Sequence, residues 1–375
     1  MRTVKLGEVV KVIGGGTPRK SEPSYYGGGV PWVTPKDMKA SEVGSSLVTL
    51  TQAGVSASPV KVVPKGSTLV VVRSGILKHT LPVAIAARDV TVNQDMKALI
   101  PAPNLDSRYL TRFIKSREAV VLTWVRATTA DNFPIQNLLE LDLPLPSLDE
   151  QRRIAAILDQ ADAIRSNRRQ VLAHLDALPG NLFRSHFPSA NFPRRAIGDL
   201  GRVSTGKTPP TSAPGMFEGE IPFVTPGDLE SDAPVARSVT SQGAAHSRTV
   251  EPGATLVCCI GATIGKVGLA SARVAFNQQI NAVEWGPDVD CAYGYWATRS
   301  IRPLIVARGA STTLPLLPKS KFSELRLPVP PLEQQREFAT IVDAARQPRD
   351  GVLQALARED ELFASLQARA FRGEV

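Results

Sequence analysis

The sequence contains an internal repeat that restricts the folds open to it. Residues 6–38 align without a gap on residues 197–229, at an offset of 191, and 13 of the 33 positions are identical. Within this window the block VPWVTPKDM faces IPFVTPGDL. Self-similarity at a fixed offset indicates a duplicated structural unit. The chain is therefore expected to fold as two similar halves.

A second pair of blocks aligns at a different offset. Residues 143–161, LPLPSLDEQRRIAAILDQA, face residues 327–345, LPVPPLEQQREFATIVDAA, at an offset of 184. The drop from 191 to 184 places seven extra residues in the first half, between Met38 and Asn93. The halves thus share both ends and differ between them, which concentrates the divergence in loops.

Each half changes character along its length. Short β-rich runs such as VVKVI, VPWVT and TLVVVRSG lie between Gly, Pro and Ser clusters and predict a loop-rich, mainly β domain with a few helices. After each proline-rich joint, apolar residues recur about every 3.5 residues, as in a coiled-coil helix. The recurring positions are Ile154, Ala161, Leu175 and Leu182 in the first half, and Phe338, Ala345, Val352 and Leu366 in the second.

These elements predict an α+β chain with a pseudo-twofold repeat, in which two loop-rich mixed α/β domains are joined by two long antiparallel helices. The expected segments are a first domain over 1–145, a helix over 146–188, a second domain over 189–329 and a helix over 330–375. A helix of about 35 residues would extend about 50 Å. Pro179-Gly180 and Pro348 should break or kink these helices, since proline removes a backbone donor. Arg168 and Glu359 occupy core-type positions in the helical pattern.

Composition favours a polyanionic partner. The chain has 375 residues and a formal charge of +9, and dispersed cations attract phosphates at long range. The three cysteines suit reduced, packed thiols, and no spacing of Cys and His suits a metal site. Neither a membrane span nor a signal peptide is indicated, so we expect a cytoplasmic protein.

One motif suggests an enzyme. Residues 201–208, GRVSTGKT, match the pattern of a phosphate-binding P-loop. A P-loop requires a helix that starts at the lysine, yet Pro209-Pro210 follow at once. The equivalent stretch of the first half also lacks the lysine. We expect no nucleotide site here, and no other catalytic motif is found.

The paired strings quoted above, together with the C-terminal SLQARAFRGEV, resemble the specificity subunit of type I restriction-modification enzymes. The resemblance covers essentially the whole chain. It implies that each domain reads one half of a split sequence in double-stranded DNA, and that the helices set the unread gap and dock two adenine methyltransferase subunits. Motor-nuclease subunits would join for restriction. The chain itself would be non-catalytic and hold no cofactor, since S-adenosylmethionine, ATP and Mg would belong to the partner subunits.

If the chain reads DNA, loop-borne basic and polar side chains should make the contacts. The candidates are Arg19, Lys20, Lys36, Arg73, Lys78 and His79 in the first half, and Lys207, Thr208, Lys266 and Arg308 in the second. Asn93-Gln94 and Asn277-Gln278 occur at equivalent positions in both halves, so a structural role is favoured over sequence discrimination. Gln151, Arg152, Gln335 and Arg336 open the two helices at matched places and are candidates for a partner interface.

An alternative of another class remains open at this point. The chain could be a duplicated coiled-coil scaffold that binds protein through its helices and never contacts specific DNA. That hypothesis explains the helical pattern but leaves the basic charge and the divergent loops without a role.

Overall fold

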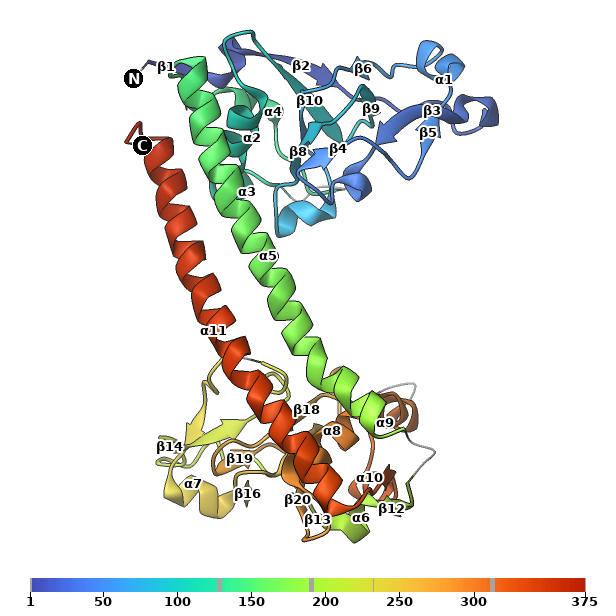
Figure 1. Cartoon of the computed structure of the whole chain (residues 1–375), viewed down its shortest axis with the longest axis vertical. Coiled ribbons are helices and arrows are strands. Elements are labelled where there is room, and N and C mark those ends of the chain that lie inside the picture. Colours follow the sequence, from blue (N-terminus) through green and yellow to red (C-terminus); the bar gives the residue numbers. More distant parts are fainter. Residues whose placement is uncertain (1, 127–129, 189–191, 232, 311–313, 375) are drawn as a thin grey trace. The chain divides into compact units, whose positions relative to one another are not determined.

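The computed structural model describes residues 2–126, 130–188, 192–231, 233–310 and 314–374. It divides into two compact units (Figure 1). Unit 1 is Met1–Arg168 with Ala355–Val375, and unit 2 is Arg169–Gln354. Each unit therefore contains one of the predicted domains together with part of both long helices.

Among the residues that the structure describes, unit 1 is built from three small sheets. Their strand orders are β1-β11, β2-β10-β7-β8-β4 and β5-β3-β9-β6. The strands are β1 (Thr3–Lys5), β2 (Val10–Gly14), β3 (Tyr26–Val33), β4 (Glu42–Val43), β5 (Thr49–Leu50), β6 (Val62–Val63), β7 (Thr68–Val71), β8 (Val83–Ala86), β9 (Val90–Val92), β10 (Met96–Pro101) and β11 (Asp142–Pro144). The helices of the domain are η1 (Leu6–Glu8), η2 (Pro23–Tyr25), η3 (Pro35–Asp37), α1 (Gln52–Ser56), η4 (Gly75–Lys78), α2 (Ser107–Ser116), α3 (Glu118–Thr123) and α4 (Ile135–Leu139).

Unit 2 repeats this plan with the strand orders β12-β21, β13-β20-β17-β18 and β15-β14-β19-β16. The strands are β12 (Arg194–Ala196), β13 (Gly201–Thr205), β14 (Phe217–Val224), β15 (Ser238–Val239), β16 (Thr249–Val250), β17 (Thr255–Cys258), β18 (Val267–Leu269), β19 (Val274–Phe276), β20 (Ile280–Trp285) and β21 (Arg326–Pro328). The helices are α6 (Ile197–Leu200), α7 (Ser241–His246), α8 (Cys291–Ser300), α9 (Arg302–Gly309) and α10 (Lys319–Ser323).

The strand registers confirm the duplication. The parallel pair β3 and β9 sets Val33 opposite Val92, and the parallel pair β14 and β19 sets Val224 opposite Phe276. These partners differ by 191 and 184, the two offsets found in the sequence. Strand β4 pairs with β8 in the stretch that carries the extra residues of the first half. The described part of unit 2 has no strand at that place.

Each unit has its own hydrophobic core, and the long helices contribute to it. In unit 1, Phe371 packs on Tyr109 and Phe113, with ring centroids 5.3 and 5.4 Å apart. In unit 2, Phe338 packs on Phe183 at 5.6 Å. A fully buried aromatic side chain contributes roughly 1.5–3 kcal/mol. The helix ends are thus part of the domain cores.

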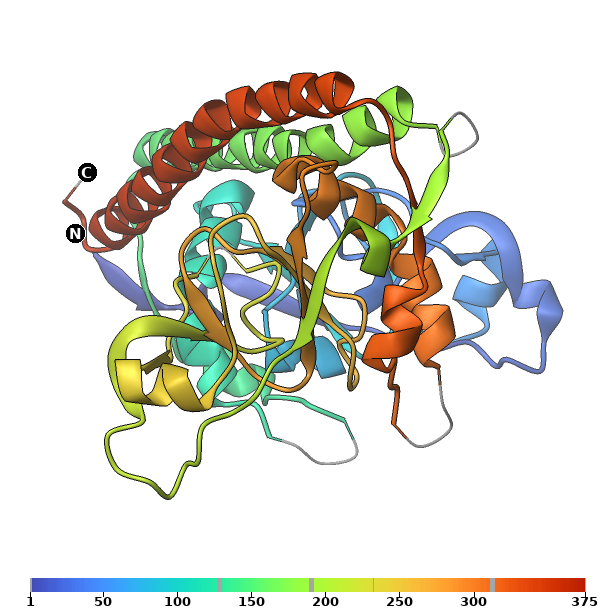
Figure 2. The same cartoon turned by 90° about the horizontal axis from the view of Figure 1, so that it is seen from below.

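The long helices are α5 (Leu148–His186) and α11 (Leu332–Ala370), and both are continuous. Neither Pro179 nor Pro348 breaks its helix, so that part of the prediction is wrong, because each proline lies inside a continuous helix; the kink stays a prediction. Pro348 is exposed, so water can replace the missing backbone donor there. Within each unit a part of α5 lies antiparallel to a part of α11, as predicted (Figures 1 and 2).

Part of the contact between α5 and α11 is made by charged pairs and not by apolar side chains. Arg168 and Glu359, the two residues that interrupt the predicted helical core, bind each other, with Arg168 Nε 2.8 and 2.9 Å from the two carboxylate oxygens. In unit 2, Arg349 Nε donates to Asp176 Oδ1 at 2.5 Å. Large apolar side chains stay exposed on the helices, including Ile164 at 46% and Leu362 at 59%. The helix pair is therefore not a regular coiled coil.

The cysteines fit the prediction in part. Cys258 and Cys259 are free and buried, as expected. Cys291 is also free, but it is exposed at the start of α8, so the prediction that it is packed is wrong. Burial raises the pKa of the Cys259 thiol to about 12, which keeps it protonated and unreactive.

Candidate nucleic-acid interface

The loop after β2 is held against the turn at residues 93–95. The amide of Gly16 donates to the carbonyl of Val92 at 3.0 Å, and Thr17 Oγ1 bonds to Gln94 Oε1. A Cβ on Gly15 would lie 1.8 Å from the Asn93 carbonyl oxygen, so only glycine permits this approach. The candidates Arg19 and Lys20 follow directly and are exposed.

Unit 2 has the same arrangement. A Cβ on Gly206 would lie 2.1 Å from the carbonyl oxygen of Asn277, and Thr208 Oγ1 donates to Gln278 Oε1 at 2.6 Å. The candidates Lys207 and Thr208 are thereby fixed beside the turn at residues 277–279. Irregular backbone follows β13 here, with no helix at Lys207. The P-loop interpretation therefore fails on geometry, as the sequence predicted.

The asparagines of both turns have a structural role, in agreement with the prediction. Asn93 and Asn277 are only 7% and 9% exposed. Asn93 Nδ2 donates to Asp95 Oδ2 at 2.9 Å, and Asn277 Nδ2 donates to Gln279 Oε1 at the same distance. Each also accepts a bond from the amide two residues on, at 3.2 Å. Their amide groups are used to shape the turns.

The connection from β7 to β8 brings further basic candidates to the first turn. Arg73 Nε donates to Asp95 Oδ1 at 2.5 Å, and Lys78 Nζ lies 3.8 Å from Asp131 Oδ2. The side chains of Arg73 and Lys78 are 47% and 63% exposed. His79 follows them and is exposed as well. The β7–β8 connection thus holds one cation on the turn, Arg73, and has two further exposed candidates, Lys78 and His79, a few residues later.

Of the remaining candidates, Lys36 lies in η3 and is exposed. It follows β3, whose last residue Val33 accepts a bond from the Asn93 amide at 3.0 Å, so it flanks the same turn. In unit 2, Arg308 is exposed on α9, while Lys266 is half-buried. In the loop after β17, the backbone amide of Gly261 donates to the carbonyl of Pro315 at 2.8 Å.

The matched glutamines at the helix starts lie inside their units. Gln151 and Gln335 are wholly buried. Gln151 Nε2 donates to the carbonyls of Asn104 at 3.0 Å and Pro146 at 2.9 Å, and its Oε1 accepts from the Asp106 amide at 2.8 Å. Gln335 makes the equivalent three bonds to Asp288, Pro330 and Asp290. The prediction that the glutamines face a partner is wrong, because their polar groups are already satisfied. Arg152 and Arg336 are exposed and remain candidates.

A tyrosine supports each of these joints. Tyr109 Oη donates to the carbonyl of Pro144 at 2.8 Å, and Tyr293 Oη donates to that of Pro328 at 2.5 Å. Burial raises the pKa of both hydroxyls, so they stay protonated as donors. The joint between domain and helix is therefore fixed by the same two side chains in both units, a signal visible in the sequence as paired Tyr and Gln positions.

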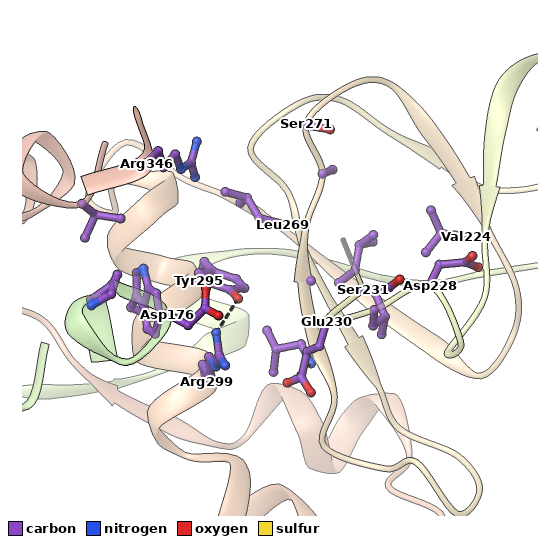
Figure 3. A pocket seen from close by; sticks show the side chains of 18 of the residues that line it. Asp176, Val224, Asp228, Glu230, Ser231, Leu269, Ser271, Tyr295, Arg299 and Arg346 are labelled. Carbon is purple, nitrogen blue, oxygen red and sulfur yellow. Dashed lines mark hydrogen bonds between the residues drawn. The ribbon is translucent and has the colours of Figure 1, made fainter. Parts of the chain in front are cut away.

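A groove in each unit separates the domain from the long helices. In unit 2 it measures about 760 Å³, and in unit 1 about 620 Å³. Figure 3 shows Tyr295 and Arg299 on one side of the unit 2 groove, bonded at 3.0 Å, with Asp228 and Glu230 from a loop on the other. Since acidic and basic groups alternate, this lining does not suit a DNA backbone. Basic loops are the better candidates for that contact.

Nothing in the described residues forms a metal centre, since no group of three or more His, Cys, Asp or Glu could hold an ion there. Within the same residues, no helix is long and apolar enough to cross a bilayer.

Comparison with known families decides the class of the protein. The family described as "Type I restriction modification DNA specificity domain" matches residues 1–176 and 191–349. The chain belongs to this family. It contains two such specificity domains, in agreement with the resemblance found in the sequence, and the scaffold alternative without DNA recognition is not favoured.

Curated relatives match parts of the chain. The EcoR124I/EcoR124II specificity subunit of Escherichia coli is 38% identical over 165 residues, covering 43% of this chain and 41% of the relative. The MjaIX specificity subunit of Methanocaldococcus jannaschii is 27% identical over 245 residues, covering 59% and 56%. The chain thus spans about half the length of these relatives.

Solved structures share the fold. A type I restriction-modification S subunit from M. genitalium superposes with a TM-score of 0.63 at 16% identity, covering 99% of this chain and 96% of that one. A chain from a study of type I assembly and conformational transition gives 0.59 at 17% identity, covering 100% and 98%. At these identities the likeness concerns the fold alone.

Proposed function

We propose that this chain is the DNA-sequence-reading, non-catalytic subunit of a type I restriction-modification assembly, and that each specificity domain reads one half of a split site in double-stranded DNA. One observation carries the proposal. Two copies of one specificity-domain fold have different side chains at the same turn, the pair Arg73 and Asp95 in unit 1 and Gln279 in unit 2. A shared fold with divergent loops suits two different half-sites.

The distribution of charge supports a duplex DNA partner. The exposed cations Arg19, Lys20, Lys36 and Lys78 come from three loops that meet at the turn of residues 93–95 in unit 1. Exposed cations on loops neutralise phosphates and release counterions, which supplies affinity without sequence preference. Side chains held in fixed orientations among them can read base edges.

The long helices support the second part of the proposal, which concerns partners. Arg152 and Arg336 are exposed at equivalent positions one residue after the buried glutamines. Exposed apolar side chains, Ile164 in unit 1 and Val171 in unit 2, are suited to packing against another protein. We infer that the helices dock two adenine methyltransferase subunits and set the unread gap, and that motor-nuclease subunits join for restriction.

Catalysis and cofactors belong to those partners in this proposal. S-adenosylmethionine would serve the methyltransferase, and ATP and Mg the motor-nuclease, with none held by this chain. The assembly would act in the cytoplasm, where duplex DNA and these cofactors are available. Replacing Lys207 with alanine is expected to leave the ATPase activity of the assembly unchanged. Loss of ATPase activity in that variant, with assembly intact, would indicate that residues 201–208 do bind nucleotide.

The decisive experiment is to co-express the chain with the presumed methyltransferase subunit and to map N6-methyladenine across the host genome. We expect a split motif with a fixed gap. Replacing residues 1–145 with the equivalent domain of another family member should change one half of the motif only. Methylation without sequence preference, or an assembled complex with no affinity for DNA, would contradict the proposal.

A further inference from the structure

We propose that Arg73 reads a guanine in the half-site recognised by the first domain, and that Asp95 holds the guanidinium for this contact. The inference rests on the proposed function, because it assigns one base contact within it. It arises from a charged pair that the structure forms at the turn of residues 93–95 in unit 1 and that is missing from the equivalent place in unit 2.

The pair is fixed on a rigid support. Arg73 lies two residues after the end of β7, and its backbone amide donates to the carbonyl of Asp95 at 3.1 Å. Its Nε and Nη2 both lie 2.5 Å from Asp95 Oδ1. The other carboxylate oxygen of Asp95 accepts from the buried Asn93. The guanidinium is therefore oriented by a carboxylate that is itself held in place.

This arrangement leaves one edge of the guanidinium available. Arginine carries five N–H donors in a planar fork, and Asp95 engages the edge formed by Nε and Nη2. No other side-chain bond of Arg73 occurs among the residues that the structure describes. The neighbouring edge, formed by Nη1 and Nη2, still has two parallel donors, and the Arg73 side chain is 47% exposed. Two parallel donors match the O6 and N7 acceptors of guanine in the major groove.

A base contact suits this pair better than a phosphate contact. Asp95 neutralises the charge of Arg73 and places an anion within 2.5 Å of it, which weakens attraction to phosphate. Lys78 has a carboxylate partner only at 3.8 Å, so its charge is less fully neutralised than that of Arg73. The N–H donors of Arg73 keep a fixed direction, because Asp95 orders the side chain before DNA binds. Little side-chain entropy is therefore lost when the contact forms. Direction and order are the properties that base recognition needs.

Unit 2 lacks the pair at the equivalent place. Strand β7 sets Val71 opposite Met96, and β17 sets Cys258 opposite Ile280. Arg73 therefore corresponds to Ile260, and Asp95 to Gln279. Gln279 keeps the bond to the turn asparagine that Asp95 makes, at 2.9 Å. The hydrogen bonds that shape the turn are thus the same in both units. The side chains on it differ, with the charged pair Arg73 and Asp95 in unit 1 and the neutral Ile260 and Gln279 in unit 2, as expected where two domains read different bases.

The test uses the assembled complex with the methyltransferase subunit. The motif is first mapped by N6-methyladenine sequencing, and the half read by the first domain is identified by exchanging residues 1–145. The wild-type complex and the Arg73→Ala and Arg73→Lys complexes then bind duplexes in which each base pair of the motif is replaced in turn. We expect both variants to lose preference for one G·C pair in that half, by roughly tenfold to a hundredfold, and to keep every other preference. Lysine should not rescue, because it cannot present two parallel donors.

Two further variants separate the possible causes. Asp95→Asn should lower the same preference while making binding to unrelated duplex stronger and more dependent on salt, because Arg73 regains its net charge. Arg202→Ala serves as the matched control, because Arg202 forms an exposed pair with Glu284 at 2.6 Å on the β13–β20 sheet, and this variant should leave the motif unchanged. All variants are first checked for assembly and thermal unfolding.

The outcomes separate the inference from the function on which it rests. If the wild-type complex shows no split motif, the proposed function fails. If a split motif is present but its first half has no G·C preference that depends on Arg73, the inference alone is overturned. The inference is also overturned if Arg73→Ala weakens binding equally for every duplex, because that pattern indicates a phosphate contact.

Discussion

Replacing Gln335 with alanine is expected to destabilise the chain by about 3–4 kcal/mol. The wholly buried side chain makes three hydrogen bonds to backbone groups, to Asp288 at 3.0 Å, Pro330 at 2.8 Å and Asp290 at 2.9 Å. Each such bond is worth about 1 kcal/mol net, and the emptied space adds a cavity cost. The loss should be large because the variant leaves one donor and two acceptors buried without partners.

The variant Gln335→Glu tests whether the lost hydrogen bonds cause this destabilisation. It keeps the oxygen that accepts from the Asp290 amide but loses both donors, and its carboxylate would face the carbonyls of Asp288 and Pro330. Burial beside carbonyls raises the folded-state pKa of this glutamate above its usual value of about 4.3. Its stability relative to wild type should therefore be greatest at low pH and fall as pH rises through that higher pKa.

The measurement is urea unfolding of the full chain at several pH values, with thermal unfolding as a second probe. Gln334→Ala is the matched control, since its side chain is exposed one position earlier on the same helix and its loss should change the free energy of unfolding little. A change below about 0.5 kcal/mol for Gln335→Ala would refute the reasoning, because it would mean that the three bonds add no net stability.

Three further predictions concern the helices and the thiols. A double-mutant cycle on Arg168 and Glu359 should give a coupling of about 1 kcal/mol that falls in high salt, because the pair is partly exposed; a coupling near zero at low salt would contradict it. Pro348→Ala should raise the unfolding temperature, because alanine restores a backbone donor within a continuous helix, and a lower unfolding temperature would show that the proline is needed there. In thiol titration of the native chain Cys291 alone should react, while Cys259 reacts only after unfolding, because burial raises its pKa to about 12; native modification of all three cysteines would disprove this.

The sequence alone determined the plan of the chain. The offsets of 191 and 184 predicted two similar domains and reappear as the register of β3 with β9 and of β14 with β19. The turn-forming stretch after Lys207, which begins Pro209-Pro210, and the absence of the lysine from the first half were enough to argue against a P-loop, and the structure has irregular backbone there. These features follow from local backbone chemistry and from pattern, both of which are written in consecutive residues.

Tertiary structure decided which polar residues face outward. Gln151 and Arg152 are neighbours with the same helix-start pattern, yet one is buried and the other exposed, since burial depends on what the folded domain places against each face. Likewise Arg73 and Asp95 are 22 residues apart, and Arg168 and Glu359 are 191 apart. No local pattern links such residues. Their pairing is created when strands and helices from distant parts of the chain meet. The sequence named Arg73 as a candidate for DNA contact, but only the structure showed that Asp95 orients it.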